Sequence, residues 1–273
     1  MSLLKKHIPI VSLFFALVCA PLLQAETLVE ETFNYLAGNL VGKNSGYGFN
    51  SAWILQNGDE DRWSVSDGVA TIAGTGVSTV RRDINPISAA TVGTFYFSFD
   101  VRIKTYSTPS GGFNDQLVFR TAGGADVFAI GIAYDSAGNR TVRTRYNNSD
   151  LNDFNNHATL AVGMTNTIVG KFVFAEGGTS ATLTLWWNPV DETSTPFRSA
   201  VELTTPSNVT DISQLRLRRQ DASGGSAAST TFDNIRIGTD WASATTSIPE
   251  PGTYAAVLSV LALGAVAWMR RRG

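Results

Sequence analysis

Cysteine and histidine are almost absent from this chain. The single cysteine, Cys19, lies in an apolar segment near the amino terminus, so the rest of the chain can form no disulfide and offers no thiolate nucleophile. The two histidines, His7 and His157, are too few for a zinc site of histidine and cysteine ligands. His157 could act as a base beside an activated serine, but the chain has no nucleophile-elbow pattern. Pairs of carboxylates remain as the catalytic option.

Charged residues are also sparse, at 16% of the chain. Lys5, Lys6 and the arginines at 270–272 lie in the two end segments, together with a single acid, Glu250. Of the 21 basic and 23 acidic residues, 16 and 22 therefore remain in the body, which carries a net charge of about -6. A mildly acidic body argues against nucleic acid as a partner, because binding to phosphates needs clustered lysine and arginine.

The segment 1–25 has the layout of a secretory signal peptide. Lys5, Lys6 and His7 form a basic start, and the apolar run that follows, 8–20, is shorter than the roughly twenty residues that span a bilayer. We predict cleavage after Ala25 and export through the secretory pathway. The alternatives are an uncleaved anchor and lipoprotein processing at Cys19, which the residues before that cysteine fit poorly.

The carboxyl terminus carries a second apolar segment. Residues 253–269 would form a transmembrane helix of about 25 Å, enough to cross a thin hydrocarbon core. The cluster Arg270, Arg271 and Arg272 would stop transfer and stay on the cytoplasmic side, so that the body faces outward. Before the helix, Pro249 and Pro251 flank Glu250 and hold the backbone extended.

This order of a Pro-Glu-Pro signature, an apolar helix and a basic cluster resembles the PEP-CTERM sorting signal, here over residues 248–273. The resemblance implies that an exosortase, a membrane-embedded cysteine transpeptidase, recognises Pro249, Glu250 and Pro251 and removes the helix. It further implies a protein held first in the cytoplasmic membrane and then sorted to the cell surface or the extracellular matrix. A permanent single-span anchor is the alternative.

The body, 26–241, is predicted to be an all-β domain. In residues 94–104, five apolar side chains alternate with polar ones, which predicts a strand with one face on the core and the other toward water. Further strands are expected at 63–72 (a hairpin turning at Asp67 and Gly68), 116–121, 127–134, 140–146, 168–175, 181–187, 215–219 and 231–237. No stretch keeps a helical period, which favours an antiparallel β-sandwich or jelly roll. Residues 242–247 are small and polar, and we expect a linker there.

The body is similar to concanavalin A-like and laminin G-like sandwiches of bacterial surface proteins. The residues that carry this resemblance are the opening segment 31–35 with Gly38, Gly46, Gly48 and Trp53, and the closing segment 232–238. The resemblance implies that the first and last strands lie together in one sheet. Sandwiches of this type include β-glucanases, in which two or three acids share one strand face, so the resemblance raises catalysis by carboxylates as an option.

Two acidic clusters are candidates for chemistry in the body. Asp59, Glu60 and Asp61 lie beside Gly58, and the adjacent Asp191 and Glu192 follow Pro189, so both clusters belong to turn-like segments. Neither has the alternating spacing that aims two carboxylates into one cleft, and we assign no catalytic residues. Asp59 and Asp61 could instead ligate a structural calcium ion.

Aromatic residues are the candidates for ligand binding. Trp186 and Trp187 are neighbours on a predicted strand and must point to opposite faces, so that one could offer a flat ring to a sugar. The alternative is that one fills the core while a loop covers the other. Arg216, Arg218 and Arg219 are interpreted as the solvated face of a strand, paired with nearby acids.

These observations favour an exported, surface-sorted protein without catalytic activity that recognises extracellular polysaccharide or belongs to a matrix. Its expected partners are exosortase, the cytoplasmic membrane and polysaccharide. The alternative is a secreted glycan hydrolase or lyase of the same fold.

Overall fold

The computed structural model describes residues 26–105, 113–134, 140–146, 149–150, 160–176, 180–204, 211–221 and 228–246. The predicted signal peptide 1–25, the predicted sorting tail 248–273 and His157 lie outside the described residues. Among the helices that are described, none has both the length and the apolar character needed to cross a bilayer.

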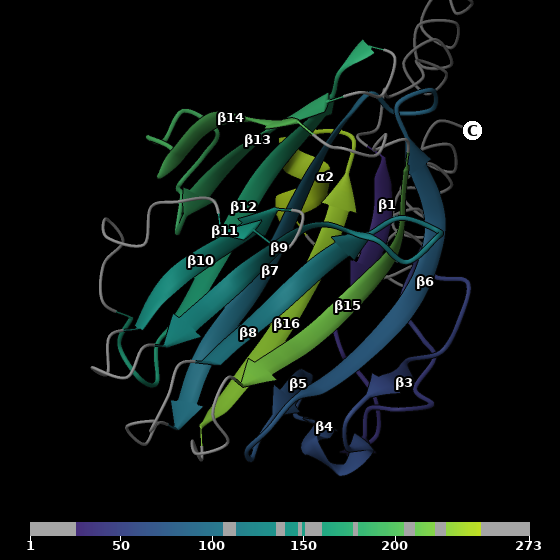
Figure 1. Cartoon of the computed structure of the whole chain (residues 1–273), viewed down its shortest axis with the longest axis vertical. Helices are drawn as coiled ribbons and strands as arrows, with labels where there is room; N and C mark the ends of the chain where they lie inside the picture. Colours follow the sequence, from purple (N-terminus) through teal and green to yellow (C-terminus); the bar gives the residue numbers. More distant parts are fainter. Residues whose placement is uncertain are drawn as a thin grey trace, which may run out of the picture.

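The described strands form two antiparallel sheets packed face to face, which confirms the predicted all-β sandwich (Figure 1). The nine-stranded sheet contains, in spatial order, β14 (Arg198–Thr204), β13 (Ser180–Trp187), β12 (Thr165–Phe174), β7 (Thr94–Thr105), β16 (Ser229–Gly238), β5 (Val69–Ile72), β4 (Trp63–Ser66) and β2 (Gly38–Asn39), with β1 (Thr27–Glu31) also paired to β16. The seven-stranded sheet contains β11 (Ser149–Asp150), β10 (Arg140–Tyr146), β9 (Asp126–Tyr134), β8 (Phe113–Arg120), β15 (Asp211–Asp221), β6 (Ser78–Ser88) and β3 (Ile54–Asn57). The pairing of β1 with β16 confirms that the chain's opening and closing segments meet in one sheet.

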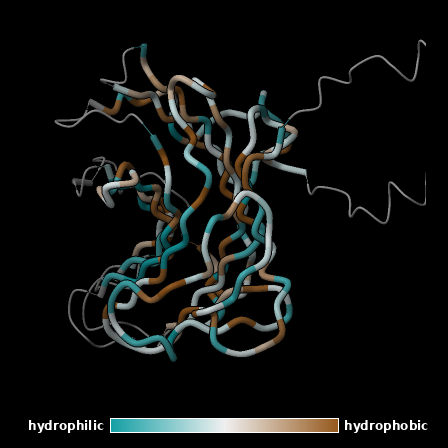
Figure 2. Tube along the Cα trace, turned by 90° about the vertical axis from the view of Figure 1, so that its right-hand side faces the viewer, coloured by the Kyte–Doolittle hydropathy of each residue, from teal (hydrophilic) through white to brown (hydrophobic). Residues whose placement is uncertain are grey.

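The core follows from alternation of apolar side chains along the central strands. In β7, all five apolar residues at odd positions, from Phe95 to Ile103, are fully buried. Phe119 and Phe128 of the opposite sheet stack on each other with ring centroids 4.2 Å apart, and Phe128 stacks on Phe172 at 5.3 Å. Hydrophobic and hydrophilic positions alternate along the strands in the side view (Figure 2), so the two sheets share one apolar layer.

Helix α2 (Trp241–Thr245) covers part of the outer face of the nine-stranded sheet. Its Trp241 ring packs edge-on against Tyr96, and the Ser98 hydroxyl donates a hydrogen bond to the Ala244 carbonyl. Residues 242–246 of the expected linker 242–247 therefore belong to the packed body. For the same reason Tyr96 and Ser98, which the alternation of β7 placed toward water, are buried.

Candidate functional site

A buried ion pair links the two sheets at one end of the sandwich. Glu31 of β1 and Arg82 of β6 lie 2.6 Å apart, and each side chain is 1% exposed. The same carboxylate accepts hydrogen bonds from the Tyr35 hydroxyl and the Trp53 indole. Burial and the Glu31 carboxylate raise the pKa of Tyr35 to about 12. Glu31, Tyr35 and Trp53 of the chain's opening segment thus belong to a buried polar network with Arg82.

The outer face of the seven-stranded sheet is unusually rich in hydrogen-bonding side chains. Strand alternation places Leu215 and Leu217 in the core and turns Gln214, Arg216 and Arg218 outward. We call this surface the polar face; its members on the three central strands and β10 are Gln214, Arg216, Arg218, Gln220, Asn114, Gln116, Arg120, Arg143 and Arg145. The facing positions of β9 are small, with Ala133 opposite Asn114 and Gly131 opposite Gln116. Arginine and amide groups are therefore the most prominent groups of this surface.

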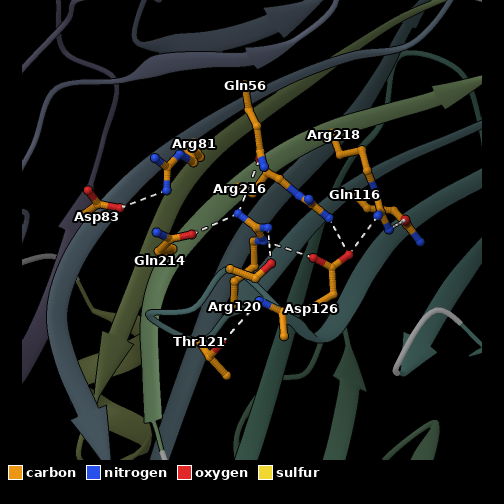
Figure 3. A network of polar contacts seen from close by, with 12 residues as sticks. Gln56, Arg81, Asp83, Gln116, Arg120, Thr121, Asp126, Gln214, Arg216 and Arg218 are labelled. Carbon is orange, nitrogen blue, oxygen red and sulfur yellow. Dashed lines mark hydrogen bonds and ion pairs between the residues drawn. The ribbon is translucent and has the colours of Figure 1, made fainter.

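Three arginines converge on one carboxylate in the middle of the polar face, as Figure 3 shows. Arg120 donates from Nε to Asp126 Oδ1 at 3.0 Å, Arg218 donates to Oδ2 at 3.0 Å, and Arg216 also contacts Oδ2. We call these four residues the arginine cluster. Their side chains are 7% to 11% exposed. One aspartate is thus shared by three guanidinium groups that water reaches poorly.

Several buried donor atoms of the polar face have no hydrogen-bond partner. They include Nε of Arg216, Nε of Arg218 and Nε2 of Gln116. The orientation of the Gln116 amide is fixed because its oxygen accepts from Arg218 at 2.8 Å, which leaves the amide nitrogen to donate elsewhere. Buried donors without a partner are costly, so each of these atoms would be stabilised by a further acceptor.

Burial and the proximity of other arginines lower the pKa values of two members of the arginine cluster. Burial is the largest effect, and together with the charges of Arg218 and Arg120 it lowers the pKa of Arg216 to about 10, against the opposing influence of Asp126. Burial likewise lowers the pKa of Arg218, with Arg145 and Arg120 adding to the effect. Positive charge is therefore held in this face at an energetic cost.

The sequence interpretation of the β15 arginines was partly wrong. Arg216 and Arg218 do pair with an acid, but they are almost buried rather than solvated. Arg219 points to the other side of the sheet and forms a bidentate pair with Asp115, with distances of 2.7 and 2.6 Å. The spacing of Arg216 and Arg218, two positions apart, indicates that they share one face of the strand. The residues that surround them lie on β8 and β9, and the sequence alone does not give the register that aligns these strands.

A second polar feature lies on the outer face of the nine-stranded sheet. Asp100 of β7 and Asp233 of β16 are cross-strand partners at the edge of a pocket of about 290 Å³ that Arg102, Lys104 and Thr231 also line. Burial and the neighbouring Asp100 raise the pKa of Asp233 to about 6, although the Asn234 amide opposes the shift. The two acids are far apart in the sequence, so no motif pointed to them.

The Asn234 side chain ties these two carboxyl groups together. Its amide nitrogen lies 2.8 Å from Asp100 Oδ2 and 3.3 Å from Asp233 Oδ2, while Thr167 donates to the other oxygen of Asp100 at 2.5 Å. Asn234 has a positive φ of 50° at the point where the β16 register shifts, a conformation that asparagine tolerates well. All these bonds fix the carboxyl groups in place.

The acids expected to bind calcium lie close together, and Asp59 makes contacts within its own loop. Asp59 caps the short 3₁₀ helix η1 (Glu60–Arg62) by accepting from the amide of Asp61, and it lies 3.9 Å from Arg62. Both aspartates are exposed. Within the described residues, no group of three or more histidine, cysteine or acidic side chains is placed to hold a metal ion. The calcium site at Asp59 and Asp61 stays a prediction.

The tryptophan pair points to opposite faces, as the strand geometry required. Trp187 packs against the core and remains partly exposed, whereas Trp186 is 5% exposed on the outer face. The Trp186 ring meets Trp241 edge-on at 5.3 Å, and its indole nitrogen donates to the Ser194 carbonyl. Trp186 therefore offers no free flat ring for a sugar.

The acids Asp191 and Glu192 are also engaged with their surroundings. Asp191 accepts hydrogen bonds from Thr193 and Ser194, and these bonds, the Thr193 hydroxyl first, lower its pKa. Glu192 accepts from the Tyr96 hydroxyl at 2.7 Å. The two carboxylates stabilise a loop and the surface beside it.

Fold and site together define a two-sheet antiparallel β-sandwich with an arginine-rich polar face. No family model and no curated protein matches the chain. Similar solved structures include the CBM2 module of the evolved Dit of Lactobacillus casei BL23 phage J-1, with 14% identity over 78% of this chain and 95% of that one and a TM-score of 0.46. Bacillus licheniformis β-glucanase gives 12% identity over 78% and 98%, with a TM-score of 0.46. Trypanosoma rangeli sialidase gives 11% identity and 0.44, and the match covers only 30% of that chain. These values are too low to transfer a ligand or an activity to this chain.

Proposed function

We propose that this chain is an exported, surface-sorted protein whose sandwich binds extracellular polysaccharide through the polar face, without turning it over. The observation that carries the binding proposal is the set of guanidinium and amide groups on one strand face, three of whose buried donor atoms have no partner. Polysaccharides present many oxygen acceptors along their length, and a site of fixed donors selects ligands that satisfy it.

The arrangement of the ends supports surface display with this face outward. Residue Glu26 meets Thr239 through a backbone hydrogen bond of 3.0 Å, so the first described strand starts where the last one ends. The described chain then finishes in α2, on the outer face of the nine-stranded sheet. A membrane tail that continues from α2 would place the opposite, polar face away from the lipid.

Two measurements distinguish polysaccharide binding from polysaccharide cleavage. The purified full chain is applied to a glycan array, and the glycans that bind are then incubated with the protein and assayed for released reducing ends. Binding without release supports the proposal, while release of reducing ends would contradict the noncatalytic role.

Sorting is tested by following the tail in an exosortase-positive host. Pulse-chase immunoblotting should show loss of the carboxyl-terminal segment, and replacement of Pro249, Glu250 and Pro251 by alanine should keep the chain at full length. Persistence of the tail in the unmodified protein would favour a permanent anchor.

A glycan hydrolase is the second candidate, and the Asp100–Asp233 pair favours it. A carboxyl group of raised pKa beside a second carboxyl group, at the edge of a pocket, is an arrangement that glycosidases use for general acid catalysis. Asp233→Asn should then abolish release of reducing sugar while glycan binding persists. An activity that is absent, or that Asp233→Asn leaves unchanged, would remove this candidate.

A further inference from the structure

We propose that the arginine cluster recognises the carboxylate groups of an acidic polysaccharide. This inference rests on the polysaccharide-binding function proposed above and specifies its ligand class. It follows from the charge balance of the cluster, its free donor atoms and the overall charge of the body.

The arginine cluster holds more positive charge than its acid can balance. Asp126 supplies one negative charge to the three guanidinium groups of Arg120, Arg216 and Arg218. The other hydrogen-bond acceptors that these arginines contact among the described residues are neutral, such as the Gln214 side chain, which accepts from Arg120 at 2.9 Å. A neutral oxygen satisfies an N–H group but does not compensate a charge, and buried charge without compensation is expensive. An incoming anion would supply what the chain lacks.

The donors that remain free are of the kind that bind carboxylates. The Nε–H groups of Arg216 and Arg218 and the Gln116 amide nitrogen have no partner, and all three residues are at least nine-tenths buried. Register places Arg216 beside Val118 and Arg218 beside Gln116, so the donors belong to adjacent rungs of β8 and β15. Guanidinium groups form strong, directional hydrogen bonds with carboxylate oxygens. A neutral sugar hydroxyl could fill one such position without relieving the excess charge.

The charge of the whole body indicates which polyanion fits. With the end segments removed, the body carries about -6, so a densely charged polyphosphate would be repelled over most of the surface. A uronic acid polymer carries its charges on separate sugar rings. Its carboxylates can meet the local positive cluster while the neutral parts of each ring contact the rest of the polar face.

Calorimetric titration of the full chain in detergent with polygalacturonate and with its carboxyl-reduced form tests the proposal. The acidic polymer should bind at least about tenfold more tightly, because hydrogen bonds from guanidinium groups to carboxylates are stronger than those to neutral hydroxyl groups. Arg216→Gln and Arg218→Gln should each lower the affinity for the acidic polymer by a similar factor. Arg218→Lys keeps the charge but loses the Nε donor, so it should also weaken binding. Lys171→Gln makes the same charge change on the other sheet and is the matched control.

The outcomes separate this inference from the function on which it rests. Equal binding of both polymers would overturn the carboxylate proposal while polysaccharide binding stands. Binding of neither polymer also overturns it, and the proposed function falls only if the glycan array is negative as well. Tighter binding of duplex DNA than of polygalacturonate would point to a phosphate ligand instead. Circular dichroism of each arginine variant checks that a loss of binding is not a loss of fold.

Discussion

Single residues in this sandwich show how costly a polar group in the core becomes. Arg82 is fully enclosed, yet its guanidinium finds Glu31 at 2.6 Å, the Ser51 carbonyl at 2.7 Å and the Asn44 side chain at 2.8 Å. Its carbon also lies 3.8 Å from the centre of the Phe49 ring, a cation–π contact. Each of the three guanidinium nitrogens donates a hydrogen bond, which helps a buried charge to be tolerated.

Removing one partner of this pair should destabilise the protein strongly. Arg82→Met leaves the Glu31 carboxylate buried without its cation, and we expect a loss of about 3–5 kcal/mol in the free energy of unfolding. Urea denaturation measures it. The double variant Glu31→Gln with Arg82→Met should recover part of the loss, since no unpaired charge remains. A single variant within about 0.5 kcal/mol of the wild type would show that the pair is not a structural requirement.

Asp233 should make stability depend on pH in a direction unusual for an acid. Its pKa is raised to about 6 in the folded protein, so the folded state binds the proton more tightly than the unfolded state. The resulting stabilisation is present below about pH 4, the ordinary range of aspartate, and is lost as the pH rises through about 6. Asp233→Asn should match the wild type at pH 4 and exceed it at pH 7 by on the order of 1 kcal/mol, because partial exposure screens the full shift. Thermal melts of both proteins between pH 4 and pH 7 measure the difference in stability. A wild type that becomes more stable relative to Asp233→Asn as the pH rises would contradict the prediction.

Among the elements, most of the long strands could be predicted from the sequence, whereas β6 could not. β7, β9, β10, β12 and β13 were found close to their bounds because their apolar side chains recur at every second position. β6 was missed because Arg82 occupies a core position and Pro86 lies near its end, so the alternation is broken where the ion pair forms. The polar face was missed for a related reason: its residues are ordinary in each strand, and only the register of β8, β9 and β15 brings them together.

The pairing of β12 with β7 depends on one glycine. Gly170 lies opposite Phe97, and a Cβ atom built there would lie 2.1 Å from the Phe97 ring. Gly170→Ala should therefore force the ring out of its stack with the neighbouring aromatics and destabilise the fold by about 1–3 kcal/mol. Equilibrium unfolding measures the change. In a double-mutant cycle, Gly170→Ala should destabilise the Phe97→Leu variant less than it destabilises the wild type. If the two effects simply add, the clash is relieved by another part of the structure.

On the scale of the whole molecule, the two outer faces of the sandwich have different roles. One carries α2 and the adjoining ends of the described chain, and the other is the polar face. If the tail enters the membrane after α2, as we propose, it would bring the first face near the lipid and turn the second toward the surroundings. Polysaccharide outside the cell would then reach the arginine cluster without entering the space between the domain and the membrane.

The scarcity of cysteine makes this orientation measurable. The body contains no cysteine, so a single one can be placed on either outer face: Ile54→Cys next to Arg81 on the seven-stranded sheet, or Glu202→Cys next to Thr182 on the nine-stranded sheet. Both positions are exposed. On cells that retain the tail, a bulky membrane-impermeant maleimide should label Ile54→Cys several-fold faster than Glu202→Cys, because the lipid surface shields the second face. After detergent extraction the two rates should converge. Equal rates on intact cells would mean that the body does not rest with its α2 side on the membrane.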